Sequence, residues 1–175
     1  VRQELIPNPL LSEYRRRYPT MYDRADIYIP FIECSLQKLR DQGVLGFICA
    51  DRWMKNRYGA PLRKLVADRF HLKVYVDMVN TPAFHSDVIA YPAITVIGRE
   101  KQGPTRVAHR PLIDRANLSR LAQELRSKKI SRGASEDIRE LDRIAQGAEP
   151  WLLGSADQTA LIRRLEQNFP KLEEV

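Results

Sequence analysis

The sequence predicts an α/β domain over residues 25–110, followed by an all-helical extension over residues 111–175. Three observations predict this class: short apolar runs alternate with helical patterns, breakers separate them, and strand-like segments are confined to the first part. Residues 1–24 are expected to be a surface loop, because prolines at positions 7, 9 and 19 interrupt regular structure. At most, a short helix is expected from Leu10 to Arg17.

The first half of the α/β domain is predicted to be helix, strand, helix. Apolar residues recur at helical spacing from Ala25 to Leu39, and Gly43 is expected to end this helix. The apolar run Val44–Cys49 is typical of a strand buried on both faces of a parallel sheet. A second helix is expected from Tyr58 to Arg69, with Pro61 in its first turn.

Two further strands are predicted to form a hairpin-like pair. His71–Val79 alternates in polarity, which places Leu72, Val74, Val76 and Met78 on one face. Val88–Ile97 is also β-rich, and its Pro92 indicates an edge position or a bulge. The polar residues 98–111 then mark a boundary.

The extension carries helical spacing and three candidate caps. Asp114 or Asn117 is expected to cap the first helix, and Ser135 to cap a second one. The second helix would carry Ile138, Leu141 and Ile144, and a third, capped by Ser155, would carry Leu161, Ile162 and Leu165.

The charge of the chain is concentrated in its first part. Of the net charge of +7, residues 1–110 supply the whole excess with 18 basic and 11 acidic residues, against 11 of each afterwards. A basic face attracts phosphate backbones. Without a signal peptide or a long apolar run, we expect a cytoplasmic protein with no membrane partner. Cys34 and Cys49 match no zinc spacing, so no metal is expected.

Motifs for several other chemistries do not occur. Neither a G-x-G-x-x-G loop, a P-loop nor a G-x-S-x-G nucleophile motif is found. Asp23 and Asp26 are close enough in sequence to act as paired carboxylates, but Asp26 is also placed to cap the helix that follows.

An ordered series of short motifs covers residues 20–97. It runs Asp26-Ile27-Tyr28, Phe31-Ile32-Glu33, Gly43-Val44-Leu45-Gly46-Phe47-Ile48, Asp51-Arg52-Trp53, Tyr58-Gly59-Ala60-Pro61-Leu62-Arg63, Val76-Asp77-Met78, Phe84-His85-Ser86-Asp87 and Ala93-Ile94-Thr95-Val96-Ile97. The series resembles the adenine-specific DNA methyltransferases of restriction–modification systems, which modify the exocyclic amino group. The series departs from the family pattern in two places. Asp41-Gln42-Gly43 stands where the family has a Pro-Gly-Gly turn, and Ala90-Tyr91-Pro92 interrupts the final strand.

The resemblance implies a Rossmann-like fold of which this chain is the later half. In the family, a cofactor loop and an Asn-Pro-Pro-Tyr segment precede the matching region, and neither is found here. We therefore expect the chain to begin just after that tetrapeptide. It would lack the segment that holds the methionine end of S-adenosylmethionine and the target amino group, and its extension would lead towards a target-recognition domain.

The resemblance also implies roles for individual residues. Phe84 would stack on the flipped target adenine, and Phe31 would pack on the adenine ring of S-adenosylmethionine, with Asp26 and Tyr28 as weaker candidates for the same pocket. An ordinary packing role for Phe84 or Phe31 remains the alternative.

Contacts to double-stranded DNA are expected from basic residues in two places. The first set follows the Val44–Cys49 strand, and the second is the triplet of residues 15–17, for which a solvated surface is the alternative. The residues are Arg52, Trp53, Lys55, Asn56 and Arg57, with Arg15, Arg16 and Arg17.

The sequence thus predicts part of a DNA adenine methyltransferase that is inactive by itself and binds S-adenosylmethionine weakly or not at all. Its partners would be DNA and the rest of the parent enzyme. The alternative is a basic, non-enzymatic module that binds DNA or docks on a partner.

Overall fold

The α/β class is confirmed by a mixed five-stranded sheet with helices packed against it. The computed structural model describes residues 3–83, 91–127, 138–142, 144, 146–154, 161, 164–165 and 168–169. The strand order is β1-β3-β2-β4-β5, in which β2 and β4 are parallel and the other neighbours are antiparallel. The elements are η1 Gln3–Leu5, α1 Asn8–Arg17, α2 Tyr28–Gln37, β1 Val44–Ala50, η2 Asp51–Met54, η3 Arg57–Gly59, α3 Ala60–Arg69, β2 His71–Asp77, β3 Pro92–Gly98, β4 Thr105–His109, α4 Arg115–Arg126 and β5 Ile138–Leu141.

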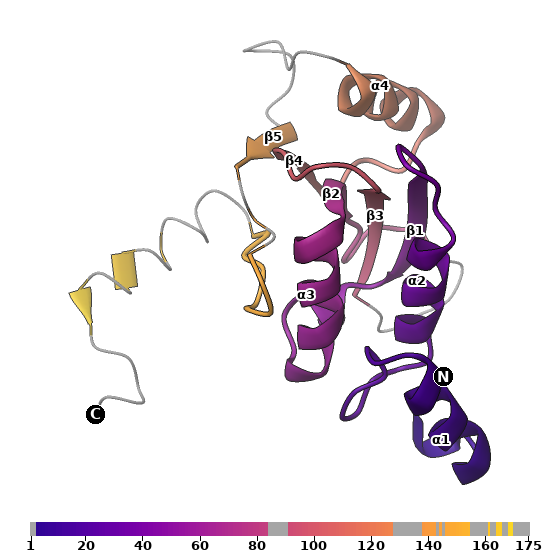
Figure 1. Ribbon diagram of the computed structural model, residues 1–175. Coiled ribbons are helices and arrows are strands. Elements are labelled where there is room, and N and C mark those ends of the chain that lie inside the picture. Colours follow the sequence, from indigo (N-terminus) through magenta and orange to yellow (C-terminus); the bar gives the residue numbers. More distant parts are fainter. Residues whose placement is uncertain are drawn as a thin grey trace.

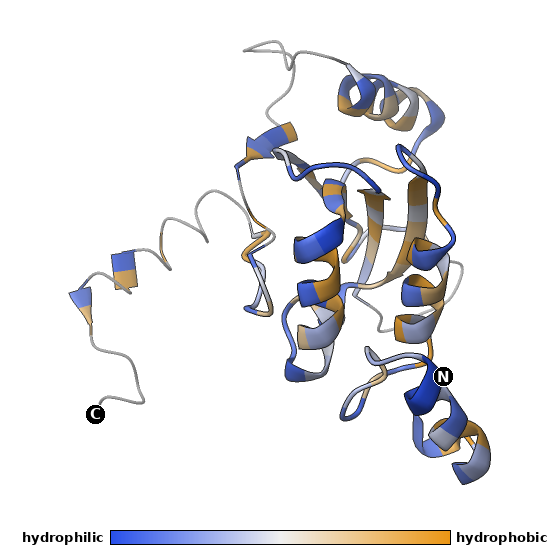
Figure 2. Cartoon of the chain, viewed as in Figure 1, coloured by the Kyte–Doolittle hydropathy of each residue, from blue (hydrophilic) through white to orange (hydrophobic). Residues whose placement is uncertain are grey.

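Helices α2 and α3 cover one face of the sheet, and α4 lies at the opposite end of the molecule from α1 (Figure 1). The main core lies under α2 and α3, where Ile32, Leu36, Leu62 and Val66 are fully buried. The strands are the most apolar part of the fold (Figure 2). Helix α3 exposes Lys64 and Asp68, whereas α2 exposes Phe31 and buries Glu33. Burial of these apolar stripes is what stabilises the helices.

Two predicted helices are confirmed with adjusted ends. Helix α2 begins at Tyr28 and ends at Gln37, so Gly43 does not cap it. Gly43 is instead required by the turn before β1, because a Cβ there would meet the Arg40 carbonyl oxygen at 2.7 Å. Helix α3 has its proline in the first turn, as predicted, because the first turn needs no N–H from that residue.

The prediction that β1 is a buried parallel strand is wrong. Within the described part of the chain, β1 pairs only with β3, to which it is antiparallel, and it forms an edge of the sheet. Its alternate residues Val44 and Ile48 are 51% and 54% exposed. A continuous apolar run therefore marks a strand with two apolar faces, one of which this chain leaves open.

Strands β2 and β3 pair as predicted, but the side chains of β2 are divided between the two faces of the sheet differently from the prediction. A register shift between Leu72 and Val74 turns the strand, so Leu72 joins the main core while Val74, Val76 and Met78 pack on the other face. Strand β3 lies inside the sheet, and Pro92 is tolerated there because it is the first residue of the strand.

The extension is not all helical. Asp114 caps α4 as predicted, accepting a hydrogen bond from the Asn117 backbone N–H at 2.9 Å. However, Ile138–Leu141, predicted as helix, forms β5 on the edge of β4, which itself arises within the predicted boundary segment. Ser135 and Ser155, the other two predicted caps, lie outside the described residues.

Residues 3–24 are packed onto the core. The short helix allowed by the sequence is present as α1 and begins at Asn8. On either side of it, Ile6 and Met21 are buried, and the buried Glu33 accepts hydrogen bonds from Thr20, at 3.1 Å from its backbone N–H and 2.6 Å from its hydroxyl. These contacts fix the segment against α2.

Candidate functional site

The carboxyl ends of β1, β2 and β4 lie side by side along one edge of the sheet, which we call the carboxyl edge. Ala50 at the end of β1 is paired with Pro92. Asp77 at the end of β2 is paired with Ala93 on one side and with His109 at the end of β4 on the other. Ligands of α/β proteins bind outside the carboxyl ends of the strands, so this edge is the candidate site.

A buried carboxylate stands directly after β1. Asp51 is 3% exposed and accepts hydrogen bonds from Lys55 Nζ at 2.7 Å and from the Tyr75 hydroxyl at 3.0 Å. Burial and the charge of Asp51 raise the pKa of Tyr75, so its hydroxyl keeps its proton as the donor. These hydrogen bonds hold the turn after β1 in place, and the charge of Lys55 is paired with the carboxylate of Asp51.

A second polar cluster lies at the ends of β2 and β4. His109 Nδ1 lies 3.5 Å from an Asp77 carboxylate oxygen, and the Arg139 guanidinium donates to His109 Nε2 at 3.3 Å. Because Nε2 accepts, the proton of a neutral His109 must be on Nδ1, facing Asp77. Burial raises the pKa of Asp77, but the hydrogen bonds from His109 and the Val79 N–H outweigh it, and the net pKa is lowered.

The two clusters meet through an aromatic contact. The rings of Tyr75 and His109 are edge to face, with their centroids 6.4 Å apart. A continuous set of packed polar groups therefore runs from β1 to β5 along the carboxyl edge.

Of the five predicted DNA-contacting residues after β1, four are exposed and one is buried. Arg52, Lys55, Asn56 and Arg57 are exposed at the carboxyl edge. The prediction for Trp53 is wrong, because this side chain is fully buried. Its ring packs edge to face on Trp151, with centroids 5.3 Å apart, and so anchors residues 146–154 to η2.

The arginine triplet lies in the last turn of α1. Arg16 Nη2 lies 2.7 Å from Glu13, and Arg17 is paired with the same carboxylate. Hydrogen bonds from both arginines lower the pKa of Glu13 to about 2. Arg15 donates to the Gln3 side chain at 3.0 Å. Two of the three arginines are thus paired with one carboxylate of the same helix.

The candidate cofactor residues lie around the start of α2. Phe31 is 59% exposed, so it presents an uncovered ring rather than a core side chain. The Tyr28 hydroxyl is bonded to that of Tyr58 at 2.8 Å, which turns Tyr28 towards η3. Asp26 does not cap the helix through its side chain; only its backbone carbonyl accepts, from the Ile29 N–H at 3.0 Å.

Phe84 lies outside the described residues. The described chain leaves the carboxyl edge at Ala83, six residues after Asp77, and returns to it at Tyr91, just before β3. The described residues on either side of Phe84 therefore adjoin this edge. Its stacking role stays a prediction.

A groove of about 770 Å³ lies on the other face of the sheet, between α4 and the strands. Its floor includes Val74, Val76, Ile94 and Val96, and Leu121 of α4 forms part of its wall. It also reaches the starts of β1 and β2, away from the carboxyl edge. We therefore do not assign the groove to the candidate site.

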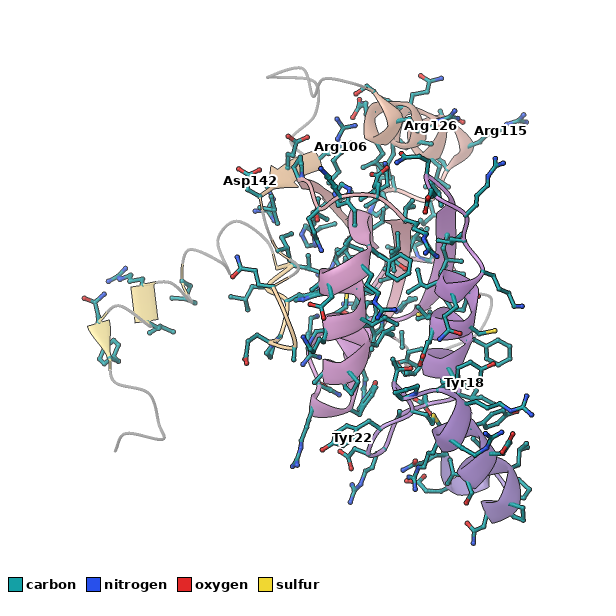
Figure 3. The ribbon with its side chains drawn as sticks, viewed as in Figure 1. Tyr18, Tyr22, Arg106, Arg115, Arg126 and Asp142 are labelled. Carbon is teal, nitrogen blue, oxygen red and sulfur yellow. The ribbon has the colours of Figure 1, made fainter. Side chains whose placement is uncertain are left out.

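Helix α4 is held over this groove by an arginine of β4. Arg106 Nη1 donates to the carbonyls of Glu124, Leu125 and Ser127, and its Nε lies 3.3 Å from Glu140. A cation at the C-terminal end of a helix also interacts favourably with the helix dipole. Figure 3 shows Arg106 beneath this end of α4, which also bears Arg126.

Sequence reasoning missed Asp51, Tyr75, Asp77, His109 and Arg139 as a set. The available signal was position, because Asp51 follows one strand and Asp77 and His109 end two others. Among the described residues there is no group of His, Cys, Asp and Glu that could hold a metal ion. No helix in the described part is long and apolar enough to cross a membrane.

Comparison with known proteins finds relatives that match almost the whole chain. A family model described as Eco57I restriction-modification methylase matches residues 1–84. The chain is 71% identical over 174 residues to the type II methyltransferase M.PaeR7I of Pseudomonas aeruginosa, covering 99% of this chain and 30% of the relative. Over nearly its whole length the chain is similar to restriction–modification methyltransferases.

A second methyltransferase relative is likewise about three times as long as this chain. M.XhoI of Xanthomonas vasicola is 51% identical over 178 residues, which cover 99% of this chain and 32% of that protein. The chain thus spans about a third of the length of these curated relatives.

Solved structures agree on the methyltransferase fold. The type IIG restriction endonuclease BpuSI aligns with a TM-score of 0.63 at 13% identity, over 99% of this chain and 22% of that chain. The EcoKI M protein of a type I restriction enzyme aligns with a TM-score of 0.57 at 11% identity, over 86% of this chain and 46% of that chain.

Proposed function

We propose that this chain is the target-binding part of a DNA methyltransferase that transfers a methyl group to the exocyclic amino group of adenine. The carboxyl edge carries the proposal, because its basic turn, its buried polar clusters and both ends of the Phe84 segment lie together. A base-modifying enzyme must extrude its target base and hold it by stacking and edge contacts. Phe84 is our candidate for the stacking ring.

The exposed turn after β1 supports contact with the DNA backbone. Arg52 and Arg57 are exposed there, whereas Lys55 is paired with Asp51 and Arg63 is buried. We assign phosphate contacts first to the two exposed arginines, with Lys55 and Asn56 beside them. The triplet on α1 is a weaker candidate, because Arg16 and Arg17 are both paired with Glu13.

We further propose that the chain alone does not methylate DNA and that the rest of the parent protein completes the site. Strand β1 has a free edge among the described residues, and its open face exposes Val44 and Ile48. Sheets of α/β proteins are covered on both faces, so further strands and helices would pack here. The relatives are about three times as long as this chain.

In the complete enzyme this chain would act through binding and orientation. Phe31 would hold the adenine ring of S-adenosylmethionine, which supplies the methyl group when bound. The rigid carboxyl edge would position the flipped base, since positioning of the two reactants accounts for much of such a rate enhancement. Asp51 and Tyr75, Asp77 and His109, and the rings of Tyr75 and His109 are in contact with each other, and these contacts would hold the edge in place.

Methyl transfer from labelled S-adenosylmethionine to DNA, with chromatography of the digested nucleosides, tests this function. The parent protein should give N6-methyladenine, and the 175-residue chain should give none. Phe84→Ala in the parent should lower kcat/KM by about 100-fold, within the range for a badly placed reactant, whereas Phe84→Tyr should retain most activity. Phe169→Ala, which removes a 65% exposed ring outside the sheet, is the matched control.

Three outcomes would contradict the proposal. Methylated cytosine from the parent would refute the adenine specificity, and activity of the isolated chain would refute its dependence on the rest of the enzyme. Salt-dependent DNA binding without methyl transfer by the parent would favour a non-enzymatic DNA-binding module.

A further inference from the structure

The guanidinium of an arginine lies over the ring of a tyrosine at the carboxyl edge. The Arg52 guanidinium carbon lies 4.6 Å from the centroid of the Tyr91 ring. Arg52 is the second residue after β1, and Tyr91 directly precedes β3. The Asp51 N–H donates to the Tyr91 carbonyl at 2.9 Å, so the backbones that carry the two side chains are joined.

Arg52 differs from its basic neighbours in how its charge is used. Lys55 is paired with Asp51 at 2.7 Å, and Arg63 is buried against carbonyl oxygens. None of the carboxylates that the structure describes lies within 4.0 Å of Arg52 in an ion pair. The described contact of its guanidinium is the ring of Tyr91, which is 41% exposed.

This contact orients the guanidinium without neutralising it. A planar guanidinium can lie with its face on an aromatic ring and still present its N–H groups at the edge to a phosphate, in a two-point contact. A carboxylate partner would fix the arginine equally well but would cancel the charge that attracts DNA.

We propose that Tyr91 is a positioning residue that holds Arg52 in the orientation in which it binds a backbone phosphate of the DNA beside the target base. The proposal rests on the proposed function only in taking DNA as the substrate. It names a phosphate rather than a base, because the guanidinium of Arg52 presents only donors and lies on the basic turn.

The test uses the parent methyltransferase and its DNA duplex over a series of salt concentrations. Tyr91→Leu removes the ring face, Tyr91→Phe keeps it, and Arg52→Gln removes the cation. Tyr91→Leu should weaken Kd about fivefold, in the range of a cation–π contact, while Tyr91→Phe should stay within about twofold of the wild type. Arg52→Gln should reduce the slope of log Kd against log salt by about 0.9, the loss of one phosphate contact.

The double variant separates positioning from an independent role of Tyr91. Arg52→Gln combined with Tyr91→Leu should bind no more weakly than Arg52→Gln alone, because the ring acts only through the arginine. In Tyr91→Leu the rise in KM for DNA should exceed any change in kcat at saturating DNA, because the ring acts through binding. Thermal melting of each variant controls for unfolding, and Tyr91→Trp, which keeps an aromatic face, should restore binding.

The results that would overturn this inference differ from those that would overturn the proposed function. An unchanged salt slope in Arg52→Gln, or losses that multiply in the double variant, would refute the inference while leaving methylation intact. A changed sequence preference with an unchanged slope would mean that Arg52 reads a base. A parent protein that neither binds nor methylates DNA would instead refute the proposed function.

Discussion

Replacing Arg63 by methionine tests the contacts that fasten residues 146–154 to the domain. Arg63 is 2% exposed; its Nε donates to the Ala148 carbonyl at 2.8 Å, and its Nη1 to the carbonyls of Trp53 at 2.7 Å and Asn56 at 2.8 Å. Hydrogen bonds from a charged donor contribute about 1.5–3 kcal/mol each, so the three contribute about 4.5–9 kcal/mol before other costs. Desolvation of the guanidinium offsets several kcal/mol of this.

Methionine fills the volume of the arginine stem but leaves three carbonyls without their donor. We therefore expect Arg63→Met to lower the free energy of unfolding by about 3 kcal/mol, at the lower end of the range for breaking a buried charged contact. With a denaturant dependence of about 2 kcal/mol per molar urea, the unfolding midpoint should fall by about 1.5 M. The fluorescence of the two tryptophans, Trp53 and Trp151, reports on this junction.

Lys64→Met is the matched control at the adjacent position. The Lys64 side chain is 63% exposed and forms an ion pair with Asp68 at 2.9 Å, so its loss should cost no more than about 0.5 kcal/mol. If Arg63→Met were as stable as Lys64→Met, the three carbonyl contacts would not fasten the segment, and this reasoning would be refuted.

Three further changes test other parts of the fold. Arg106→Met should speed hydrogen exchange of the α4 amides, because it removes the donor at the helix C-terminal end, whereas Arg126→Met at the exposed face should not. Burial raises the pKa of the Cys49 thiol to about 12 in the folded chain, whereas in the unfolded chain it is near 8.5. Above about pH 9 the thiol therefore loses its proton in the unfolded chain first, and the free energy of unfolding should fall. Cys49→Ala should make that fall shallower in urea midpoints measured at pH 8 and 10.5; an identical fall would exclude this thiol as a cause. Trp151→Ala should cost about 3–5 kcal/mol in urea unfolding, and a loss below about 1 kcal/mol would mean that its packing is dispensable.

Elements with strong local patterns could be predicted from the sequence. Helix α4 was predicted with its cap, because a cap residue directly before an apolar helical stripe is a local signal. Strand β1 was located correctly from its apolar run, but its pairing was not. Pairing depends on β3, which lies about 50 residues later, and nothing in Val44–Ala50 itself specifies the direction of its neighbour.

The elements that were missed depend on distant partners. Strand β5 has only four residues, and Ile138 and Leu141 are spaced as in a helix. Only Ile138 among them is buried, and the strand is formed by its antiparallel pairing with β4. Strand β4 is short and lies between two prolines, Pro104 and Pro111, which favoured a loop. In both cases tertiary pairing outweighed the local pattern.

The candidate site also has one part that could be predicted from the sequence and one part that could not. The basic turn after β1 could be predicted because its residues are contiguous in sequence, yet the burial of Trp53 could not. Its partner Trp151 lies about 100 residues later and carried no motif. The contacts of Asp51 with Tyr75, and of Asp77 with His109, likewise join strand ends that only the sheet brings together.

The turn after β1 has two faces with different tasks. Its buried face, Trp53, packs on Trp151, and Arg63 joins the same turn to Ala148. Its exposed face carries Arg52, the proposed phosphate contact. Because both faces belong to η2, which is only four residues long, a shift of residues 146–154 would move the DNA-facing arginine as well. Arg63→Met in the parent should therefore weaken DNA binding in addition to stability. Unchanged Kd in a folded Arg63→Met enzyme would show that the two faces are independent.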